Sequence, residues 1–115
     1  MSETFNAASV QRLLQAGDAV EAVRQLDQWH TDNAPTSESL YLLAVSHRYA
    51  GNLPQALETV EQLHTQAPRF GRGFQEAGHI YLAARNQQQA LTAFQRAVAL
   101  NDSLLGSWRA IVKLC

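Results

Sequence analysis

Three histidines stand at equal intervals in this sequence, and histidines are common ligands of metal ions. His30, His47 and His64 are each 17 residues apart, which is half of a 34-residue period that runs through the chain. Successive histidines therefore fall on alternate helices and face different ways, whereas a metal site needs its ligands to converge. No His-Glu-x-x-His or paired-cysteine pattern accompanies them. The sequence predicts no metal site.

Neither nucleophilic nor nucleotide-binding chemistry is indicated. The one cysteine, Cys115, follows a predicted helix, whereas a reactive thiol is activated by a base or by a helix N-terminus. Gly71, Gly73 and Gly78 do not match a dinucleotide-binding loop, because the last glycine is misplaced and no strand precedes them. We expect Gly71 and Gly73 to loosen a turn and Gly78 to allow a close helix approach. The chain is predicted not to be an enzyme and to have no catalytic residue and no cofactor.

The elements that would position any site begin with a device repeated every 34 residues. Asp18, Asn52 and Asn86 each stand three residues before Glu or Gln and four before Ala. Such an N-cap side chain accepts a hydrogen bond from the first amides of a helix, and alanine lets a neighbouring helix approach closely. Each device is therefore predicted to open the second helix of a helix pair. Ser103 is predicted to cap a last helix.

Two copies of the repeat, residues 37–70 and 71–104, match in the size of their side chains. The aligned positions are Leu40 with Phe74, Ala44 with Gly78, His47 with Tyr81, Leu57 with Leu91, and Val60 with Phe94. This pattern resembles the tetratricopeptide repeat (TPR). The resemblance implies a single all-α domain, a right-handed α-solenoid of antiparallel helix pairs with roughly seven helices. Its expected parts are three repeats and a partial repeat or capping helix, over residues 3–36, 37–70, 71–104 and 105–115.

Both ends depart from the repeat pattern. Asn6 stands where a large residue is expected, and Phe5 is predicted to pack in its place. The last helix spreads apolar residues more widely than one preceding repeat can cover. These residues are Trp108, Ile111, Val112 and Leu114. We therefore expect a fragment of a longer protein, and the alternative is a natural end with an apolar capping helix.

The formal net charge of −1 is unevenly distributed. Residues 1–68 hold eight acids and three arginines, a net charge of −5, whereas residues 69–115 hold six bases and two acids, a net charge of +4. This asymmetry could steer an anionic partner to the C-terminal half or favour head-to-tail contacts between copies, and the alternative is a pair of solvated faces. The sequence has no basic leader before an apolar run and no membrane-spanning stretch, which predicts a cytoplasmic protein.

The TPR resemblance implies that the first helix of each pair lines a concave surface. The predicted partner-binding residues on it are Tyr41, Val45, Arg48, Tyr49, Arg69, Arg72, Gln75, His79, Arg109 and Lys113. Arg72 and Arg109 are expected to bind acidic groups of a protein or peptide partner. Tyr41 and Tyr49 are expected to make apolar contacts with it. Alternatively, these tyrosines pack between adjacent first helices.

Two classes of partner are disfavoured. TPR domains that bind the acidic tails of chaperones use a clamp of Lys and Asn, and the aligned positions here hold other residues, namely Ala7, Gln11, Tyr41, Val45 and Glu76. Binding to nucleic acid usually rests on about 6 to 10 phosphate contacts. The late basic residues fall on both faces of their helices instead of one stripe. We expect neither partner.

A further resemblance is to the N-terminal repeat region of bacterial TPR-containing sulfotransferases. The similar segments are Arg69-Phe-Gly-Arg72, Ala90 to Asn101 and Ser107-Trp-Arg-Ala110. This resemblance implies a parent enzyme that transfers a sulfuryl group from an activated nucleotide through a separate catalytic domain, with no catalytic residue in this chain. The alternatives are a standalone adaptor and a self-associating scaffold whose last helix docks on another copy.

Overall fold

The computed structural model describes residues 6–114, and these residues form seven helices and no strand. The helices are α1 (Ala7–Gln15), α2 (Ala19–Asp32), α3 (Ser37–Tyr49), α4 (Leu53–Gln66), α5 (Gly71–Ala83), α6 (Gln87–Leu100) and α7 (Leu105–Leu114). No helix in this part of the chain combines the length and apolar character needed to cross a membrane. The predictions for Phe5 and Cys115 concern residues that lie outside the described range.

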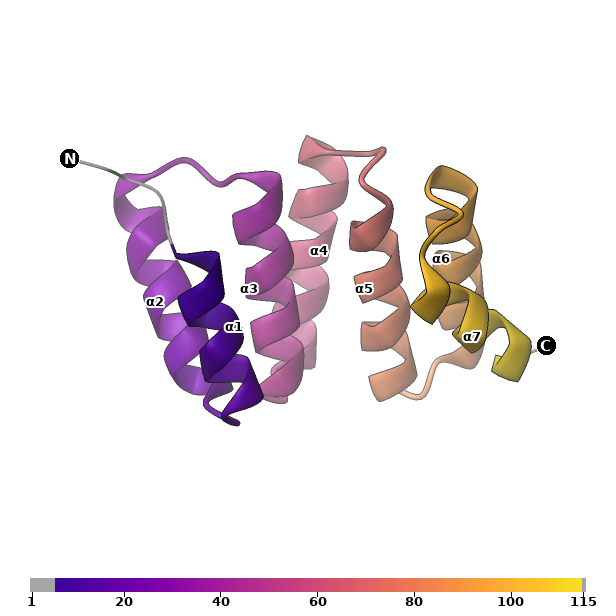
Figure 1. The fold of residues 1–115 in the computed structure, drawn as a ribbon, viewed down its shortest axis with the longest axis horizontal. Helices are drawn as coiled ribbons and strands as arrows, with labels where there is room; N and C mark the ends of the chain where they lie inside the picture. Colours follow the sequence, from indigo (N-terminus) through magenta and orange to yellow (C-terminus); the bar gives the residue numbers. More distant parts are fainter. Residues whose placement is uncertain (1–5, 115) are drawn as a thin grey trace.

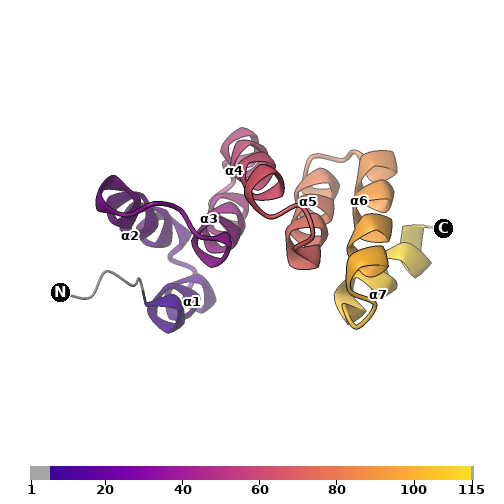
Figure 2. The same ribbon diagram turned by 90° about the horizontal axis from the view of Figure 1, so that it is seen from above.

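Consecutive helices pair side by side, and the pairs stack along the long axis of the molecule (Figures 1 and 2). Each of the first helices, α1, α3, α5 and α7, contacts the next first helix in the row. The second helices, α2, α4 and α6, contact only the helices before and after them in the sequence. The first helices therefore form the inner face of the stack. The whole stack measures 47 × 26 × 22 Å. The predicted all-α solenoid of helix pairs is confirmed.

The predicted helix starts are correct, although only two of the three caps form. The carboxylate of Asp18 and the amide oxygen of Asn86 each accept a hydrogen bond from the backbone three residues later, at 3.3 Å and 3.2 Å. Asn52 makes no such bond. Its side-chain nitrogen lies 3.4 Å from Nδ1 of His47 instead, and Pro54 in the first turn has no amide hydrogen to satisfy.

The prediction that Ser103 caps the last helix is wrong. Its hydroxyl donates to the side-chain oxygen of Asn101 at 2.7 Å, which closes a turn before α7. The indole of Trp108 donates to the carbonyl of Asp102 at 2.8 Å, so this turn is fastened to α7 from the other side. The connection thus restrains the direction in which α7 leaves α6.

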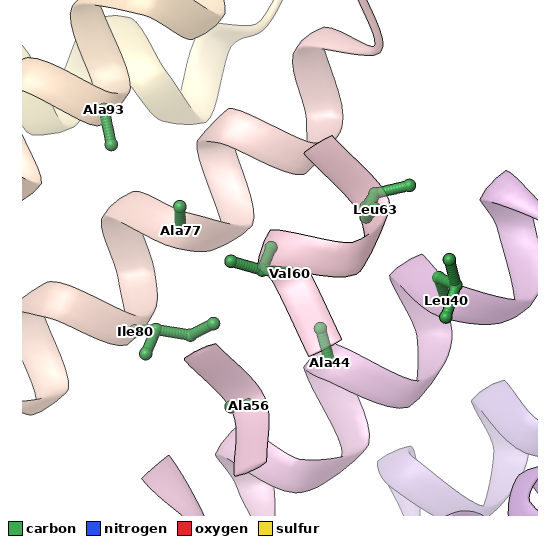
Figure 3. Close-up of a cluster of buried hydrophobic side chains, with 8 residues drawn as sticks. All are labelled: Leu40, Ala44, Ala56, Val60, Leu63, Ala77, Ile80 and Ala93. Atoms are coloured by element: carbon green, nitrogen blue, oxygen red, sulfur yellow. The ribbon is translucent and has the colours of Figure 1, made fainter. Parts of the chain in front are cut away.

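Small side chains bring the helices of the stack close together. The main buried cluster joins α3, α4, α5 and α6 and consists of Leu40, Ala44, Ala56, Val60, Leu63, Ala77, Ile80 and Ala93 (Figure 3). A second cluster joins α1, α2 and α3 through Val10, Ala22, Leu26, Leu42 and Leu43. Alanines at the points of closest approach leave room for the larger side chains between them. Two buried clusters, both contacted by Tyr41, therefore support the inner face.

The three glycines of α5 all serve close packing. A Cβ atom at Gly78 would lie 2.6 Å from the ring of Phe94, which confirms the predicted close helix approach. Gly71 and Gly73 do not loosen a turn as predicted, because both lie within the first turn of α5 and are buried. A Cβ at Gly73 would come within 3.0 Å of Leu63. The start of α5 is therefore tightly seated on α4.

Candidate partner-binding site

At the start of α3 and α5, a guanidinium group lies on an aromatic pair of the inner face. The rings of Tyr41 and Phe70 meet edge to face at 6.0 Å, and the guanidinium carbon of Arg72 lies 4.3 Å from the Tyr41 ring centre. The carboxylate of Glu38 is 3.8 Å from Arg72, and both side chains are well exposed. Tyr41 also packs against both core clusters. Arg72 is thus held in place at the surface while its ion pair within the chain stays weak.

Two of the predicted binding residues are used within the fold. Arg48 of α3 holds Glu76 of α5 through two contacts, of 2.5 Å and 3.0 Å. Glu76 is only 2% exposed, and this burial raises its pKa above the usual value, an effect that the hydrogen bonds from Arg48 partly offset. Val45 is buried. Arg48 and Val45 therefore offer a partner little charge or surface.

Two further predicted residues near these elements, Tyr49 and Arg69, remain at the surface. Tyr49 is 59% exposed, with the guanidinium carbon of Arg48 4.7 Å from its ring centre. It therefore does not pack between adjacent first helices, which was the alternative for this residue. Arg69 is exposed in the turn before α5.

A hollow of the inner face opens between α5 and α7. The two helices touch near the start of α7, where the hydroxyl of Ser107 donates to the side-chain oxygen of Gln75 at 2.7 Å. From there α7 runs obliquely away from α5 toward the C-terminus (Figures 1 and 2). The resulting groove has a volume of about 830 Å³. Its lining residues are His79, Leu82, Gln87, Gly106, Trp108, Arg109, Ala110, Val112, Lys113 and Leu114.

This α5–α7 groove combines apolar walls with positive charge. Trp108 and Val112 are both exposed although they are large apolar residues, and Val112 is 74% exposed. Arg109 and Lys113 follow them in sequence and are also exposed. Among the described residues that line the groove, none is Asp or Glu. The groove is therefore suited to a segment that carries both apolar and acidic side chains.

His79 joins the groove to the core. Its ring meets the Phe94 ring edge to face at 5.1 Å on one side and lines the groove on the other. Burial, and to a smaller extent the positive charge of Arg48, lower the pKa of His79 to about 4. The imidazole is therefore neutral near pH 7 and provides a polar, uncharged hydrogen-bonding group.

The structure brings three of the predicted binding residues, His79, Arg109 and Lys113, together in one groove. The sequence indicated that Trp108 and Val112 form surplus apolar surface, and it did not indicate that they line this groove. The signal that could have shown this is their spacing of four residues beside Arg109 and Lys113. The described residues hold no cluster of three His, Cys, Asp or Glu side chains arranged to bind a metal ion.

No family model matches this sequence, and no curated protein matches it by sequence. Solved structures match its fold. The TPR domain of Sgt2 from Aspergillus fumigatus is similar with a TM-score of 0.84 at 12% identity, over 93% of this chain and 72% of that chain. At such identity the likeness shows the fold alone, which is the solenoid fold of TPR domains.

Two similar structures contain bound segments. The second TPR domain of human RPAP3, in complex with an HSP70 peptide, has a TM-score of 0.80 at 10% identity, over 93% of this chain and 89% of that chain. PcrH of Pseudomonas aeruginosa, in complex with the chaperone binding region of PopB, has a TM-score of 0.72 at 14% identity, over 96% of this chain and 94% of that chain.

Proposed function

We propose that this chain is a protein-interaction module that binds a segment of a partner protein on its inner face, with the α5–α7 groove at the centre of the site. The observation that carries this proposal is the groove itself, in which exposed apolar side chains lie beside two cations and no acid. The fold supports it, because similar TPR structures hold an HSP70 peptide and a region of PopB. In this proposal the chain performs no chemistry of its own.

The partner segment carries acidic groups. Arg109 and Lys113 supply positive charge at the groove, and Arg72 supplies it further along the same face. Arg72 is oriented by the Tyr41 ring, so it loses little side-chain freedom when it binds a carboxylate. Tyr49 and Arg69 extend the proposed contact surface at its edge. The chaperone-tail clamp remains disfavoured, because Tyr41 and Glu76 occupy two of its positions.

A selection from a library of random displayed peptides tests this function. We expect the selected peptides to be rich in Asp, Glu and large apolar residues and to bind to the inner face. The double variant Arg109→Glu with Lys113→Glu reverses both positive charges of the groove. It should lower the affinity for such peptides by about tenfold or more, because charge complementarity is lost.

The matched control reverses charge on the outer face, in the variant Arg96→Glu, and should leave binding unchanged. Arg96 is an exposed residue of α6 and lies outside the α5–α7 groove. Peptides that respond to Arg96→Glu and ignore the groove cations would contradict the proposed site.

The surroundings of the module are proposed from resemblance alone. The similarity of the segments Arg69–Arg72, Ala90–Asn101 and Ser107–Ala110 to bacterial TPR-containing sulfotransferases supports a cytoplasmic bacterial parent with a separate sulfotransferase domain. The groove would then dock a protein substrate or the catalytic domain. Sulfuryl transfer by the native full-length protein, measured with an activated sulfate donor, tests this parentage; a native protein without transferase activity would contradict it.

A second candidate function is that of a self-associating scaffold. The observation that favours it is the exposed apolar surface of α7, formed by Leu105, Trp108 and Val112. Sedimentation velocity across a range of concentrations tests it, since a reversible dimer that disappears on the change Val112→Glu would support self-association. A monomer at every concentration would reject it.

A further inference from the structure

A separate pocket lies on the outer side of the stack, where the second helices are. It opens between α4 and α6, and α5 lies between these two helices (Figure 1). In the described part of the chain α5 contacts both of them, and they do not contact each other. This α4–α6 pocket has a volume of about 210 Å³. Pockets for drug-sized ligands measure about 300–1,000 Å³, so this pocket suits a smaller molecule.

The α4–α6 pocket is lined by one acidic and one basic side chain, which come from different helices. Glu61 belongs to α4 and Arg96 to α6, and both are exposed. Neither forms an ion pair with another described residue. The guanidinium carbon of Arg96 lies 5.3 Å from the centre of the Phe74 ring, which orients the cation. The pocket therefore offers a negative and a positive group that no ion pair within the fold neutralises.

His64 lies near both charged groups and adds no third charge. Its ring stacks on the Phe74 ring, with the ring centres 3.9 Å apart. Burial is the largest cause that lowers the pKa of His64. The Gly73 backbone and the charge of Glu61 raise this pKa, and the charge of Arg96 lowers it. The imidazole is therefore uncharged near pH 7, and the charges of the pocket are those of Glu61 and Arg96.

The rest of the pocket lining combines apolar and uncharged polar groups. Val60, Ala77 and Ala93 contribute apolar surface, one residue from each of the three helices. The hydroxyl of Thr92 donates to the carbonyl of Gln88 at 3.2 Å, so its oxygen remains able to accept a hydrogen bond. A ligand that carries charged groups and a small apolar part therefore finds complementary groups in this pocket.

The charge pair is not a requirement of the repeat. The positions between α2 and α4 that align with the pocket lining hold Gln62 in place of Arg96. They include the acids Asp27 and Glu58 and no lysine or arginine. Helix pairs of this chain thus stack with or without a cation at this place. The packing of the helices alone does not explain why Arg96 stands across from Glu61.

We propose that the α4–α6 pocket binds a small zwitterion, namely an α-amino acid with an apolar side chain. The carboxylate pairs with Arg96, the ammonium group pairs with Glu61, and the side chain lies against the apolar lining. A simple anion would be repelled by Glu61 and a simple cation by Arg96, so a molecule that carries both charges complements the pocket best. This site is separate from the α5–α7 groove and does not depend on the proposed function.

Free leucine and two of its analogues test which charges the pocket requires. Isocaproate has the carbon frame and the carboxylate of leucine without the ammonium group, and isoamylamine has the ammonium group without the carboxylate. Each compound is titrated into the ¹⁵N-labelled chain, and the backbone NMR shift changes give its affinity. With leucine we expect saturable changes at His64, Phe74 and Arg96. Each analogue should bind about tenfold more weakly or worse, because it lacks one charged hydrogen-bonding group.

Charge-neutral variants show where each group of leucine binds. We expect Arg96→Gln and Glu61→Gln each to lower the affinity for leucine by about tenfold. Glu61→Gln should not lower the affinity for isocaproate, because the glutamine does not repel its carboxylate. The matched control is Glu58→Gln, since Glu58 is also an exposed acid of α4 but lies outside the pocket. This control should bind leucine as the unmodified chain does. All three variants should keep its melting temperature, because these side chains are exposed.

Each contrary outcome overturns the inference in a recognisable way. If leucine causes no saturable shift change around the α4–α6 pocket, the pocket is not an amino-acid site. If isocaproate or isoamylamine binds as tightly as leucine, the pocket recognises a single charge and the zwitterion proposal is wrong. If Glu58→Gln weakens leucine as much as Glu61→Gln does, the effect comes from the overall charge of α4 and the assigned contact is wrong.

Discussion

A methyl group at position 78 would lie 2.6 Å from the ring of Phe94, closer than side-chain carbons approach in proteins. We predict that Gly78→Ala destabilises the chain by about 1–3 kcal/mol, because it overpacks the contact between α5 and α6. Urea unfolding followed by circular dichroism measures the change. Alanine also has a helix propensity about 1 kcal/mol more favourable than that of glycine, and this gain offsets only part of the loss from overpacking.

Gly106→Ala is the matched control, because it is the same substitution in a helix at a position where the added methyl group makes no clash. A Cβ there would lie 3.4 Å from the side chain of Gln75, an ordinary contact. We expect this variant to equal the unmodified chain or to exceed its stability by up to about 1 kcal/mol. Gly78→Ala with the stability of Gly106→Ala would contradict the packing argument.

Some features of single residues could be predicted from the sequence pattern, and others could not. The caps at Asp18 and Asn86 could be predicted, because an N-cap bond depends on residues within one turn. Gly17 and Gly51 end their helices with positive φ angles of 81° and 83°, and the third copy places Arg85 there at 64°. Residues other than glycine rarely adopt this backbone conformation. Comparing residue types between the copies therefore does not identify Arg85 as the residue that ends the third of these helices.

One ion pair links the elements of the inner face. Arg48 of α3 and Glu76 of α5 are paired and largely buried, so removing one partner leaves the other charge uncompensated. We predict that Arg48→Met lowers the free energy of unfolding by about 3–5 kcal/mol. In the double variant Arg48→Met with Glu76→Leu, most of this loss should be recovered, because no buried charge remains. Chemical denaturation of the two single variants and the double variant measures this cycle.

Additive losses in that cycle would contradict the account, since they would mean that the two side chains do not interact. The sequence did not reveal this pair. The aligned pattern placed Arg48 on the partner-binding face, and the pairing depends on the approach of α3 to α5, between residues 28 positions apart.

The direction of α7 could not be predicted from the sequence either. The apolar residues of α7 predicted a helix with too much exposed surface, and this is what Trp108 and Val112 show. The direction of this surface depends on contacts between α7 and other parts of the chain, notably those of Trp108 with Asp102 and of Ser107 with Gln75. Helix positions follow from local patterns, whereas the angle between helices follows from such tertiary contacts. For this reason the groove itself could not be predicted.

At the scale of the whole molecule, burial sets how stability varies with pH. Burial lowers the pKa of all four histidines, His30, His47, His64 and His79, and that of His79 falls to about 4. Below their usual value of 6.5 the unfolded chain binds protons that the folded chain does not. We therefore predict that stability falls as the pH is lowered from about 6.5 toward 4.

Urea midpoints at pH 7.5 and pH 5 measure this dependence, and His79→Gln should make it shallower. The variant tests the contribution of the histidine by itself. The raised pKa of Glu76 has the opposite effect on the pH dependence, because its contribution to stability is lost as the pH rises above the usual value of 4.5. A midpoint that stays constant or rises at pH 5, or an equal slope in His79→Gln, would contradict the prediction.

Backbone NMR tests whether the inner-face groove between α5 and α7 binds the partner. Spectra of the ¹⁵N-labelled chain would be recorded during titration with an acidic peptide obtained from the display selection. We predict that the largest shift changes fall on His79, Leu82 and the α7 residues from Trp108 to Lys113. Shift changes concentrated on the outer helices α2, α4 and α6, or no saturable change at all, would contradict binding in this groove.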